Sequence, residues 1–455
     1  MPVIWWIRRD LRLTDNAALH AALEGDSVIP AFIIDPAFSD SSPRRKNFLY
    51  EGLHALDKDL RARNSYLVIR TGEPLALLGQ LLRETNSDAI FAEEDFTPYA
   101  RKRDAEIERQ LPLHLVHGQT VHHPMDLLKS DGKPYRLFTP YSKAWKAKLP
   151  SSLKLYPAPE QFKTPAGIPS EQLPGFKLNP IFPAGEQEAL VRLEEFLHRK
   201  IYAYHQTRNR MDLDGTSSLS PYLHFGMLGL RQAVHSARQA IAEGSSGASK
   251  HSAEIWLNEL IWREFFIQVL FHFPQVGQGA FHTSLGNIAW RNDASEFEAW
   301  KAGRTGVPIV DAAMRQLKEI GWMHNRARMI AASYLVKDLL IDWRRGEQYF
   351  MEQLLDGDKA ANNGGWQWIA GTGVDAAPYF RIFNPVAQSA KFDPSGDYIR
   401  RWVPELRDVE TKDIHAPWER GIKLKGYPER PIVERDSEKT IRAYQASKRS
   451  ELERI

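Results

Sequence analysis

The sequence contains no cysteine. This absence excludes disulfide bonds, cysteine-held iron–sulfur clusters, zinc fingers and thiol nucleophiles. An apolar run of about twenty residues is also missing, so no membrane-spanning helix is expected. At the N-terminus, MPVIWWIRRDLR places its apolar run before its arginines, which is the reverse of a secretory signal. We therefore expect a protein of the cytoplasm, or of another reducing compartment, without a membrane span.

Other absences narrow the chemistry. The turn after the first apolar run reads RRDLRLTDN and lacks a GxGxxG dinucleotide fingerprint. No H-E-x-x-H pattern or Ser–His–Asp order points to hydrolysis, and no metal site is expected. Positive and negative residues nearly balance, so the net charge is only +3 at pH 7. This small excess permits a nucleic-acid partner without requiring one. Tryptophan is abundant, with 13 residues that lie mostly in the second half of the chain.

The first 130 residues alternate short apolar runs with helical patterns. The runs, each expected to be a strand buried on both faces, are Val3–Ile7, Val28–Ile34, Tyr66–Ile69, Ala89–Ala92 and Leu113–Val116. Leucines recur at helical spacing between them, at Leu49, Leu53, Leu56 and Leu60 and at Leu75, Leu78, Leu81 and Leu82. Asp15 or Asn16 can cap the first helix, and Gly72 marks a strand-to-helix turn. The alternation predicts a parallel, doubly wound (Rossmann-like) α/β domain over residues 1–130.

A connection and a helical domain are expected to follow. Seven prolines between Pro157 and Pro183 are too dense for regular elements, so residues 131–186 are assigned to an interdomain linker. After Glu186 the patterns are helical, including long ones over 255–271 and 323–340, and no strand alternation of any length is present. Residues 187–455 are therefore predicted to form an all-α domain, with a polar, charge-rich tail after Glu405.

The stretch Asp356–Gln388 combines unusual groups. It contains DGDKAANNGGWQW, in which two carboxylates are followed by two amides, two glycines and two indoles. Gly364 and Gly365 remove side chains where the backbone would have to approach something flat and bulky. This inventory suits an aromatic, hydrogen-bonding cofactor, although a Gly-rich loop with two core tryptophans would have the same composition.

Hydroxyl groups gather before a second helical pattern. Gly215–Ser220 reads GTSSLS and precedes Pro221, so it can form an anion site at a helix N-terminus or serve for ordinary capping by Thr216 or Ser217. Upstream, Tyr204 and Arg208 are expected at i,i+4 on one helix face.

Two helical patterns carry polar groups among apolar ones. In Glu254–Phe271, Trp256, Glu259 and Trp262 share a face, and Glu259 is either solvent-exposed or paired with an arginine unless it serves a site. In Gly321–Trp343, Asn325, Arg328 and Met329 would face one site while Arg326 points elsewhere. Arg328 is a candidate partner for a carboxylate of Asp356–Gln388, and a lone His324 is more often structural than a base.

These segments together resemble the photolyase/cryptochrome flavoprotein family, and specifically its class I cyclobutane pyrimidine dimer (CPD) DNA photolyases. The resemblance covers nearly the whole chain. It is carried by WWIRRDLRLTDN, GTSSLSPYLHFG, WLNELIWREFF, GRTGVPIVDAAMRQL, GWMHNRARM and DGDKAANNGGWQW…PYFRIFNPVAQSAKFDPSGDYIRRWVPEL. It implies an N-terminal α/β antenna domain and a helical domain that holds FAD, which acts in its reduced form.

The resemblance also implies roles for individual residues. FAD would be held by Tyr204, Thr216, Ser217, Ser218, Leu219, Ser220, Trp256, Glu259, Asn325, Arg328, Asp356, Asp358 and Asn362. Catalysis would depend on Glu259, Met329 and Asn362, with Asn362 facing the flavin N5 and Arg328 paired with Asp356. Electrons for photoreduction would pass through Trp290, Trp343 and Trp366. UV-damaged DNA would contact Arg208, Trp262, Asn325, Arg326, Met329 and Trp368.

The implied activity is that of a deoxyribodipyrimidine photo-lyase, a carbon–carbon lyase. Excited FADH⁻ donates an electron to a pyrimidine dimer that has been flipped out of DNA, the cyclobutane ring splits, and the electron returns. The alternative is a blue-light signalling cryptochrome, but such proteins usually replace the Asn at the position of Asn362 by Asp or Cys. The (6-4) photolyases carry a His-His pair where this chain has His324-Asn325, and the iron–sulfur branch needs cysteines. A light-independent binding or structural flavoprotein is a further alternative.

An antenna pigment is the remaining implication. Folate-binding relatives hold methenyltetrahydrofolate with an Asn-Glu pair, where this chain has Pro98-Tyr99. The surrounding FTPYARKRD is more similar to the deazaflavin-binding type, so 8-hydroxy-5-deazaflavin is favoured, while an empty or flavin-filled site stays open. Nothing in the sequence calls for more than a monomer.

Overall fold

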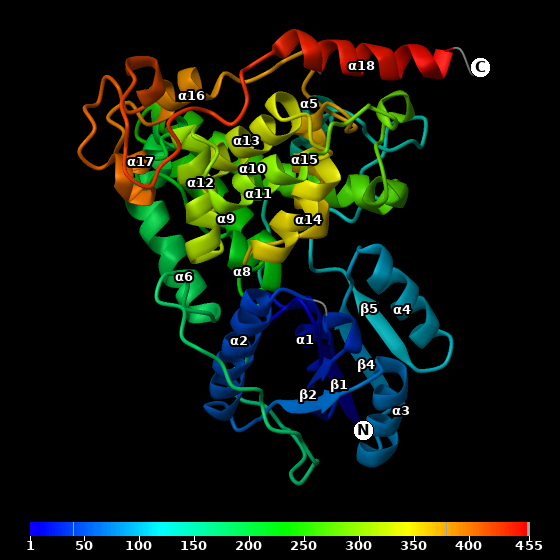
Figure 1. The fold of residues 1–455 in the computed structure, drawn as a ribbon. Coiled ribbons are helices and arrows are strands. Elements are labelled where there is room, and N and C mark those ends of the chain that lie inside the picture. Colours follow the sequence, from blue (N-terminus) through cyan, green and yellow to red (C-terminus); the bar gives the residue numbers. More distant parts are fainter. Residues whose placement is uncertain (40, 379, 453–455) are drawn as a thin grey trace. The chain divides into compact units, whose positions relative to one another are not determined.

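The computed structural model describes residues 1–39, 41–378 and 380–452 (Figure 1). Tyr379, within the Asp356–Gln388 stretch, and the last three residues of the predicted helical domain lie outside the described residues. The chain divides into two compact units. The first comprises Met1–His205 and Ser217–His272, and the second comprises Gln206–Thr216 and Phe273–Ile455.

The first unit is built on a five-stranded parallel sheet with the order β3-β2-β1-β4-β5. Its strands are β1 (Pro2–Ile7), β2 (Ser27–Ile34), β3 (Val68–Thr71), β4 (Ala89–Glu93) and β5 (Leu113–Val116). Each one overlaps a predicted strand, and the order reverses direction at β1, which is the mark of a doubly wound sheet. The predicted Rossmann-like fold is confirmed.

Burial follows the position of each strand in the sheet. The central strands β1 and β2 are buried along nearly their whole length. One face of the sheet carries Ile4, Trp6 and Ile29, which pack with Leu78 and Leu81 of a following helix in one apolar cluster. The expectation that every strand is buried on both faces is wrong for the two edges, since β3 and β5 each end in partly exposed residues. An edge strand has a neighbour on one side only.

The first unit also contains helices around and beyond the sheet. They are α1 (Ala17–Ala22), η1 (Pro36–Phe38), α2 (Pro43–Arg61), α3 (Pro74–Thr85), α4 (Pro98–Glu108), α5 (Phe138–Lys148), α6 (Glu186–Glu195), η2 (Phe196–Lys200), η3 (Ile201–Ala203), α8 (Ser220–Phe225), α9 (Leu230–Glu243) and α10 (Gly247–His272). A short α7 (Tyr204–Thr207) crosses from the first unit into the second. Of the two candidate caps of α1, Asn16 is the residue that caps the helix, because its side chain accepts a hydrogen bond from the N–H of Leu19.

The range assigned to the linker contains one helix that was not predicted, α5. Its Pro140 lies in the first turn, where the missing N–H costs no helical hydrogen bond. From Leu149 to Gly185 the chain has no helix or strand, as the density of prolines predicts. The predicted boundaries near residues 130 and 186 mark changes in the type of secondary structure, whereas the two compact units are defined by packing. The predicted boundaries therefore stay a prediction.

Helices make up the second unit, and its described residues contain no strand. They are η4 (Pro274–Gly277), η5 (Thr283–Leu285), α11 (Ala294–Ala302), α12 (Pro308–Ile320), α13 (Asn325–Ser333), η6 (Tyr334–Asp338), α14 (Trp343–Gln353), α15 (Lys359–Ala370), α16 (Pro385–Phe392), α17 (Asp397–Trp402), η7 (Pro404–Leu406), η8 (Pro417–Arg420) and α18 (Ser437–Leu452). The tail after Glu405 is charge-rich as predicted, yet its described part contains the sixteen-residue helix α18. The predicted helix over 323–340 is α13 continued by the π-helix η6.

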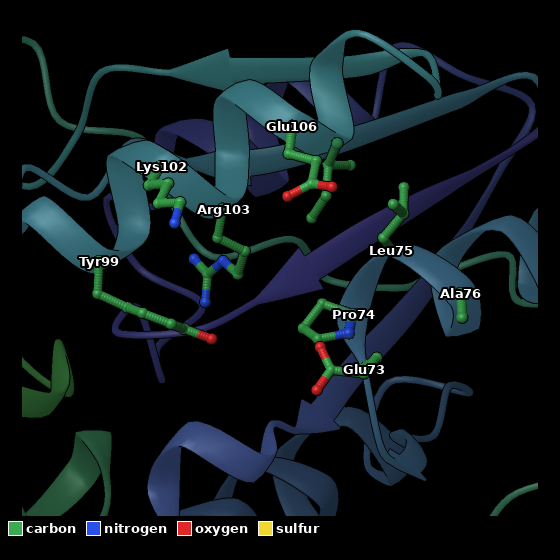
Figure 2. A pocket seen from close by; sticks show the side chains of 9 residues that line it. Glu73, Pro74, Leu75, Ala76, Tyr99, Lys102, Arg103 and Glu106 are labelled. Carbon is green, nitrogen blue, oxygen red and sulfur yellow. The ribbon is translucent and has the colours of Figure 1, made fainter.

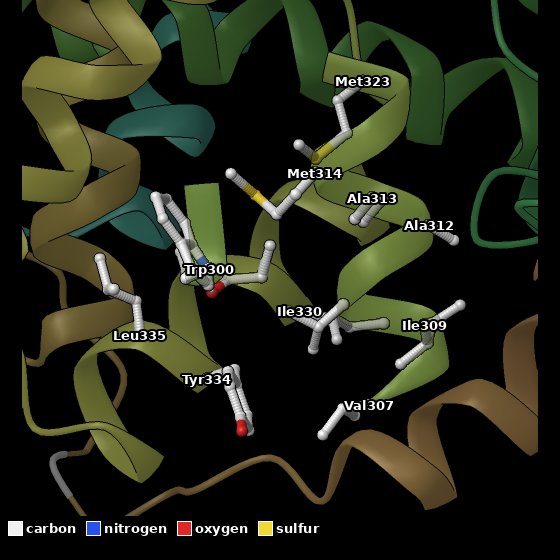
Figure 3. Packing of buried hydrophobic residues seen from close by; sticks show 14 of the residues in the cluster. Trp300, Val307, Ile309, Ala312, Ala313, Met314, Met323, Ile330, Tyr334 and Leu335 are labelled. Atoms are coloured by element: carbon white, nitrogen blue, oxygen red, sulfur yellow. The ribbon is translucent and has the colours of Figure 1, made fainter. Parts of the chain in front are cut away.

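One large apolar cluster holds the second unit together (Figure 3). Trp300 of α11 is fully buried in it, and its indole N–H donates to the carbonyl of Ala331 at 3.0 Å. Met314 of α12 and Leu335 of η6 pack in the same cluster, which also contains Trp366 of α15. The core therefore fixes the helices that carry the candidate site of this unit. Among the described residues, no helix is long and apolar enough to cross a lipid bilayer.

Candidate functional site

In the first unit, candidate residues lie along one face of α10. Trp256 is buried, and its ring is tilted against the ring of Phe196 with the two centroids 5.0 Å apart. Glu259 and Trp262 are half-buried. Because Glu259 is half-buried, the alternative of a fully solvent-exposed carboxylate does not apply. Tyr204, also buried, contacts Phe196 edge-on at 5.8 Å. The predicted Tyr204–Arg208 helix face is wrong, because α7 ends at Thr207.

The hydroxyl-rich segment precedes α8 without capping it. The N-cap position of α8 is occupied by Leu219, and no side chain accepts a capping hydrogen bond there. The alternative of ordinary capping by Thr216 or Ser217 is therefore wrong. Ser218 has a φ of 50°, a left-handed conformation that is uncommon outside glycine. Ser217, Ser218 and Ser220 are half-buried, and the assignment of this segment to a phosphate group stays a prediction.

In the second unit, the predicted Arg328–Asp356 ion pair is confirmed. Nη2 of Arg328 donates to Oδ2 of Asp356 at 2.7 Å, and Nε of Arg328 donates to the carbonyl of Met323. The Asp356 side chain is almost completely buried, so the guanidinium offsets the cost of a buried carboxylate. The second oxygen, Oδ1, is buried and has no hydrogen-bond partner among the described residues. Such an orphaned acceptor fits a hydroxyl group of a bound ligand.

Asp358 has a local structural role. Its side chain caps α15 by accepting from the N–H groups of Ala360 and Ala361, both at 3.0 Å. This cap fixes the first turn of the helix that carries Asn362, Trp366 and Trp368. Whether Asp358 also touches a cofactor stays a prediction.

The amide of Asn362 has a defined orientation. Its Nδ2 donates to the backbone carbonyl of Glu347 at 3.0 Å, and a carbonyl oxygen can only accept, so the amide oxygen Oδ1 must point away. The neighbouring Asn363 donates to Oε1 of Glu347 and to the carbonyl of Val276. Burial raises the pKa of Glu347 to about 7, although the bond from Asn363 opposes this shift. The amide oxygen of Asn362 is therefore left as a hydrogen-bond acceptor on the side away from Glu347.

The two tryptophans of α15 differ in their surroundings. Trp366 is buried, with its ring edge-on to Phe350 at 4.9 Å and to Trp300 at 6.2 Å. Trp368 is half-buried at the margin of the apolar cluster. A Cβ placed on Gly365, which immediately precedes Trp366, would meet no atom within 4 Å beyond its chain neighbours and the backbone of its own helix, so the backbone is open to close approach there. The two indoles differ in burial, and their division between two partners stays a prediction.

Trp343 and Trp290 lie in the same unit. Trp343 is buried at the start of α14, which Asp342 caps. Trp290 is half-buried and contacts the ring of Tyr444 edge-on at 5.9 Å. The order buried Trp366, buried Trp343, partly exposed Trp290 suits a path from interior to surface, and the electron-transfer role stays a prediction.

The start of α13 holds Asn325 and Met329. Asn325 is exposed and its amide lies 3.9 Å from the sulfur of Met329, so the structure brings these two predicted site residues together. His324 is the N-cap of α13, since its Nδ1 accepts from the N–H of Arg326 at 3.1 Å. Burial, with Arg326 and Arg328 nearby, lowers the pKa of His324 to about 4, so it stays neutral. The interpretation of His324 as structural rather than as a base is supported.

Arginines form a cationic group in the second unit. Arg326 donates to Oδ1 of Asn209 at 2.7 Å through Nη2 and lies over the ring of Phe392. Burial, together with the charges of Arg208 and Arg381, lowers the pKa of Arg326 to about 10. A phosphate group would stabilise the positive charges of arginines that lie this close together. Among the described residues, no metal-binding group of three or more His, Asp or Glu side chains is present.

The α/β part of the first unit has a cavity of about 580 Å³ (Figure 2). Tyr99, Lys102, Arg103 and Glu106 of α4 face Glu73 and Pro74 at the start of α3 across it. The hydroxyl of Tyr99 donates to Asp35 at 2.7 Å, and the Arg103 guanidinium lies 4.7 Å from the ring of Trp6. Aromatic surface and cationic groups therefore meet beside the sheet, in a volume typical of small-molecule sites.

Sequence reasoning missed several partners. Asn209 and Glu347 lie outside the quoted motifs, Arg381 lies within one but was given no role, and Phe138 was placed in a linker. Each of them is far along the chain from the residue it contacts or influences. The arginines of the RRDLRLTDN segment were given no role from the sequence, yet they take part in a buried ionic network. Arg8 pairs with Asp104 there, and Arg12 pairs with Glu93 at 2.8 Å.

Parts of this chain match two protein families. Residues 3–163 match the family described as DNA photolyase, and residues 256–448 match the FAD binding domain of DNA photolyase. A deoxyribodipyrimidine photo-lyase of Synechococcus is 41% identical over 454 residues, covering 95% of this chain and 93% of the relative.

Solved structures agree with these matches. A class III photolyase of Agrobacterium tumefaciens superposes with a TM-score of 0.93 at 37% identity, and 98% of each chain is covered. A photolyase of Sulfolobus tokodaii with two FAD molecules reaches 0.84 at 33% identity, covering 99% of this chain and all of the other. A Synechocystis cryptochrome reaches 0.87 at 31% identity, covering 98% and 99%.

Proposed function

Because this chain belongs to the DNA photolyase family, we propose that it repairs cyclobutane pyrimidine dimers in DNA by light-driven electron transfer. The predicted enzyme type, a lyase of the deoxyribodipyrimidine photo-lyase kind, is confirmed by its relatives, and so is the assignment to FAD-dependent DNA repair. The CPD substrate, the class I subdivision and the residue roles are the finer part of the proposal. A class III photolyase is among the similar structures, so the subdivision stays a prediction.

One observation carries the proposal, the fixed amide of Asn362. Its oxygen is left as an acceptor by the bond from Nδ2 to Glu347. An acceptor suits the N–H that the flavin N5 bears when FAD is reduced, which is the state that repair requires. The orphaned Oδ1 of Asp356 suits a ligand hydroxyl, and Gly365 leaves the backbone open. The residues of the second unit therefore fit FAD.

When bound, reduced FAD supplies the electron that opens the cyclobutane ring and takes it back afterwards. The protein's own residues bind and orient. Arg328 holds the Asp356 carboxylate in place through their ion pair, and the amide oxygen of Asn362 would hold the N5 proton of the bound flavin. Trp366, Trp343 and Trp290 supply electrons that bring the cofactor to its reduced state. Tyr204, the Thr216–Ser220 segment and Trp256 complete the proposed cofactor contacts.

Substrate binding is assigned to a second group of residues. Arg208 and Arg326 bind the phosphates of damaged DNA, because their mutual crowding is relieved by an anion. Trp262 and Trp368 are half-buried indoles that would flank the flipped dimer and exclude water from it. Glu259, Asn325 and Met329 would contact the bases, with Glu259 hydrogen-bonded to a thymine.

The test is a repair assay with defined lesions. Purified protein is mixed with an oligonucleotide that carries one thymine dimer, and intact thymines are measured by chromatography after near-UV or blue light and after darkness. We expect restoration in the light only. A second oligonucleotide with a (6-4) lesion should remain unrepaired, because His324-Asn325 replaces the His-His pair of (6-4) enzymes. Equal light and dark samples would overturn the repair proposal.

A cryptochrome-like photoreceptor is the second candidate, favoured by the match to the Synechocystis cryptochrome. Asn362 opposes it, because signalling members usually carry Asp or Cys at this position. The assay above separates the two functions: a photoreceptor would bind FAD and respond to light without restoring thymines.

The cavity between α3 and α4 is the candidate antenna site. We propose that it takes a light-harvesting chromophore, with 8-hydroxy-5-deazaflavin favoured over methenyltetrahydrofolate. Tyr99 and Arg103 supply ring and cationic contacts, and Tyr99 stands where folate binders have a carboxylate. The Sulfolobus tokodaii relative contains a second FAD, so a flavin is the competing occupant. Reconstitution with each compound, followed by absorption spectra of wild type and Tyr99→Ala, distinguishes them, since only the true occupant's band should be lost in the variant.

The remaining assignments concern the molecule in the cell. We propose that it acts as a monomer and in the cytoplasm, with damaged DNA as its partner. Sedimentation velocity at several protein concentrations tests the first point, and an increase in mass with concentration would contradict it.

A further inference from the structure

An aromatic stack covers one predicted substrate residue. The ring of Phe138, the first residue of α5, lies parallel to the indole of Trp262 on α10, with centroids 3.7 Å apart and planes 4° apart. Phe265 meets the same indole edge-on at 5.5 Å, and Phe266 lies at 5.4 Å. Trp262 is therefore held from several sides while it remains half-buried.

The position of Phe138 is set by buried anchors further along α5. The indole N–H of Trp145, which is fully buried, donates to Oε2 of Glu264 on α10 at 2.5 Å. The ring of Tyr141 contacts Phe265 at 5.2 Å. These contacts fix α5 along α10, so its first turn presents Phe138 to Trp262 in one arrangement. Phe138 also meets the ring of Phe265 edge-on, with centroids 5.9 Å apart.

We propose that Phe138 is a positioning residue for substrate binding, which acts by fixing the plane of the Trp262 indole. The inference rests on the proposed function, in which Trp262 flanks the flipped dimer. An indole whose plane is already set loses less conformational freedom on binding, and its covered face is kept from water. Aromatic pairs of this kind contribute about 0.5–1.5 kcal/mol, which corresponds to roughly a 2- to 12-fold change in an equilibrium constant.

The test compares the affinity for a dimer-containing duplex with that for the undamaged duplex, measured in the dark. Phe138→Ala should lower this ratio by about 3- to 10-fold. Phe138→Leu, which keeps the apolar bulk without a flat ring, should show a similar loss, and Phe138→Tyr should restore the ratio. Leu137→Ala removes an exposed neighbour on the same turn and should leave the ratio unchanged.

A double-mutant cycle shows whether Phe138 acts through Trp262. In a Trp262→Ala background, Phe138→Ala should cause no additional loss. An undiminished further loss would overturn the inference, because Phe138 would then contact DNA directly. An unchanged ratio in Phe138→Ala, in a protein whose wild type discriminates dimers, would overturn it as well. Failure of the wild type to prefer dimer-containing DNA would instead contradict the proposed function. If Phe138→Ala does not fold, the Leu and Tyr variants decide the same question.

Discussion

At the scale of single residues, α15 assigns neighbouring side chains to different tasks. Asn362 is held by a hydrogen bond to a backbone carbonyl, which any substitution that lacks a side-chain donor loses. Trp368, by contrast, packs at the margin of the apolar cluster. Functional consequences of changes at these two positions should therefore be separable.

Replacing Asn362 by Ala removes the acceptor proposed to face the flavin N5. We expect the FAD of this variant to reduce more slowly in light and to reoxidise faster, while its affinity for dimer-containing DNA changes by less than about 3-fold. Trp368→Ala should do the reverse, with a loss in dimer affinity of about 10-fold or more, in the range of base–aromatic stacking. Absorption spectroscopy follows the first effect and titration in the dark follows the second. Equal effects of both changes in both assays would contradict the division.

At the scale of elements, α14 and α15 depend on one glycine for their contact. A Cβ on Gly346 would lie 2.2 Å from Cη2 of Trp366 and 2.6 Å from Leu335. Gly346→Ala should therefore destabilise the protein by about 1–3 kcal/mol, the usual cost of overpacking, and displace the indole proposed to reduce the cofactor. Urea unfolding and the rate of photoreduction measure the two effects.

Gly365→Ala serves as the matched control on α15. No atom beyond its chain neighbours and the backbone of its own helix lies within 4 Å of the added Cβ, and Ala favours a helix over Gly by about 1 kcal/mol. The protein without FAD should therefore become slightly more stable. If both glycine variants lost the same stability, steric crowding at Trp366 would not be the cause in Gly346→Ala.

Some elements were predictable and others were not, for physical reasons. The strands β1 and β2 were visible because burial on both faces demands continuous apolar runs, as in Val3–Ile7. Helix α18 was hidden, since few of its side chains dock against the protein: Thr440, Tyr444 and Ser447 are buried in a sequence rich in charge. In the candidate site, Arg328–Asp356 was predictable because each charge needs a partner when buried. The stack of Phe138 on Trp262 was not, because a pair that distant in sequence leaves no local pattern.

At the scale of the whole molecule, one buried lysine should contribute to how stability depends on pH. Lys337 of η6 is buried, donates to the carbonyl of Ala370 at 3.0 Å and lies 3.9 Å from the centre of the Tyr444 ring. Burial lowers the pKa of Lys337 to about 7, from 10.5. Asp338, next to it, carries a pKa that burial raises to about 7, against the charge of Arg435. Their effects on stability fall mainly on opposite sides of pH 7.

The sign for Lys337 follows from proton binding. Between pH 7 and about 10 the unfolded chain binds a proton that the folded protein has released, so the free energy of unfolding rises with pH, by up to about 1.4 kcal/mol per pH unit. Lys337→Met keeps the length of the side chain without the proton and should remove this rise. Its stability relative to wild type should therefore be highest near pH 7 and fall toward pH 10, whereas Lys439→Met, an exposed lysine on α18, should show no such trend. Denaturant unfolding across this range measures the difference, and parallel curves for wild type and Lys337→Met would show that Lys337 keeps its proton when folded.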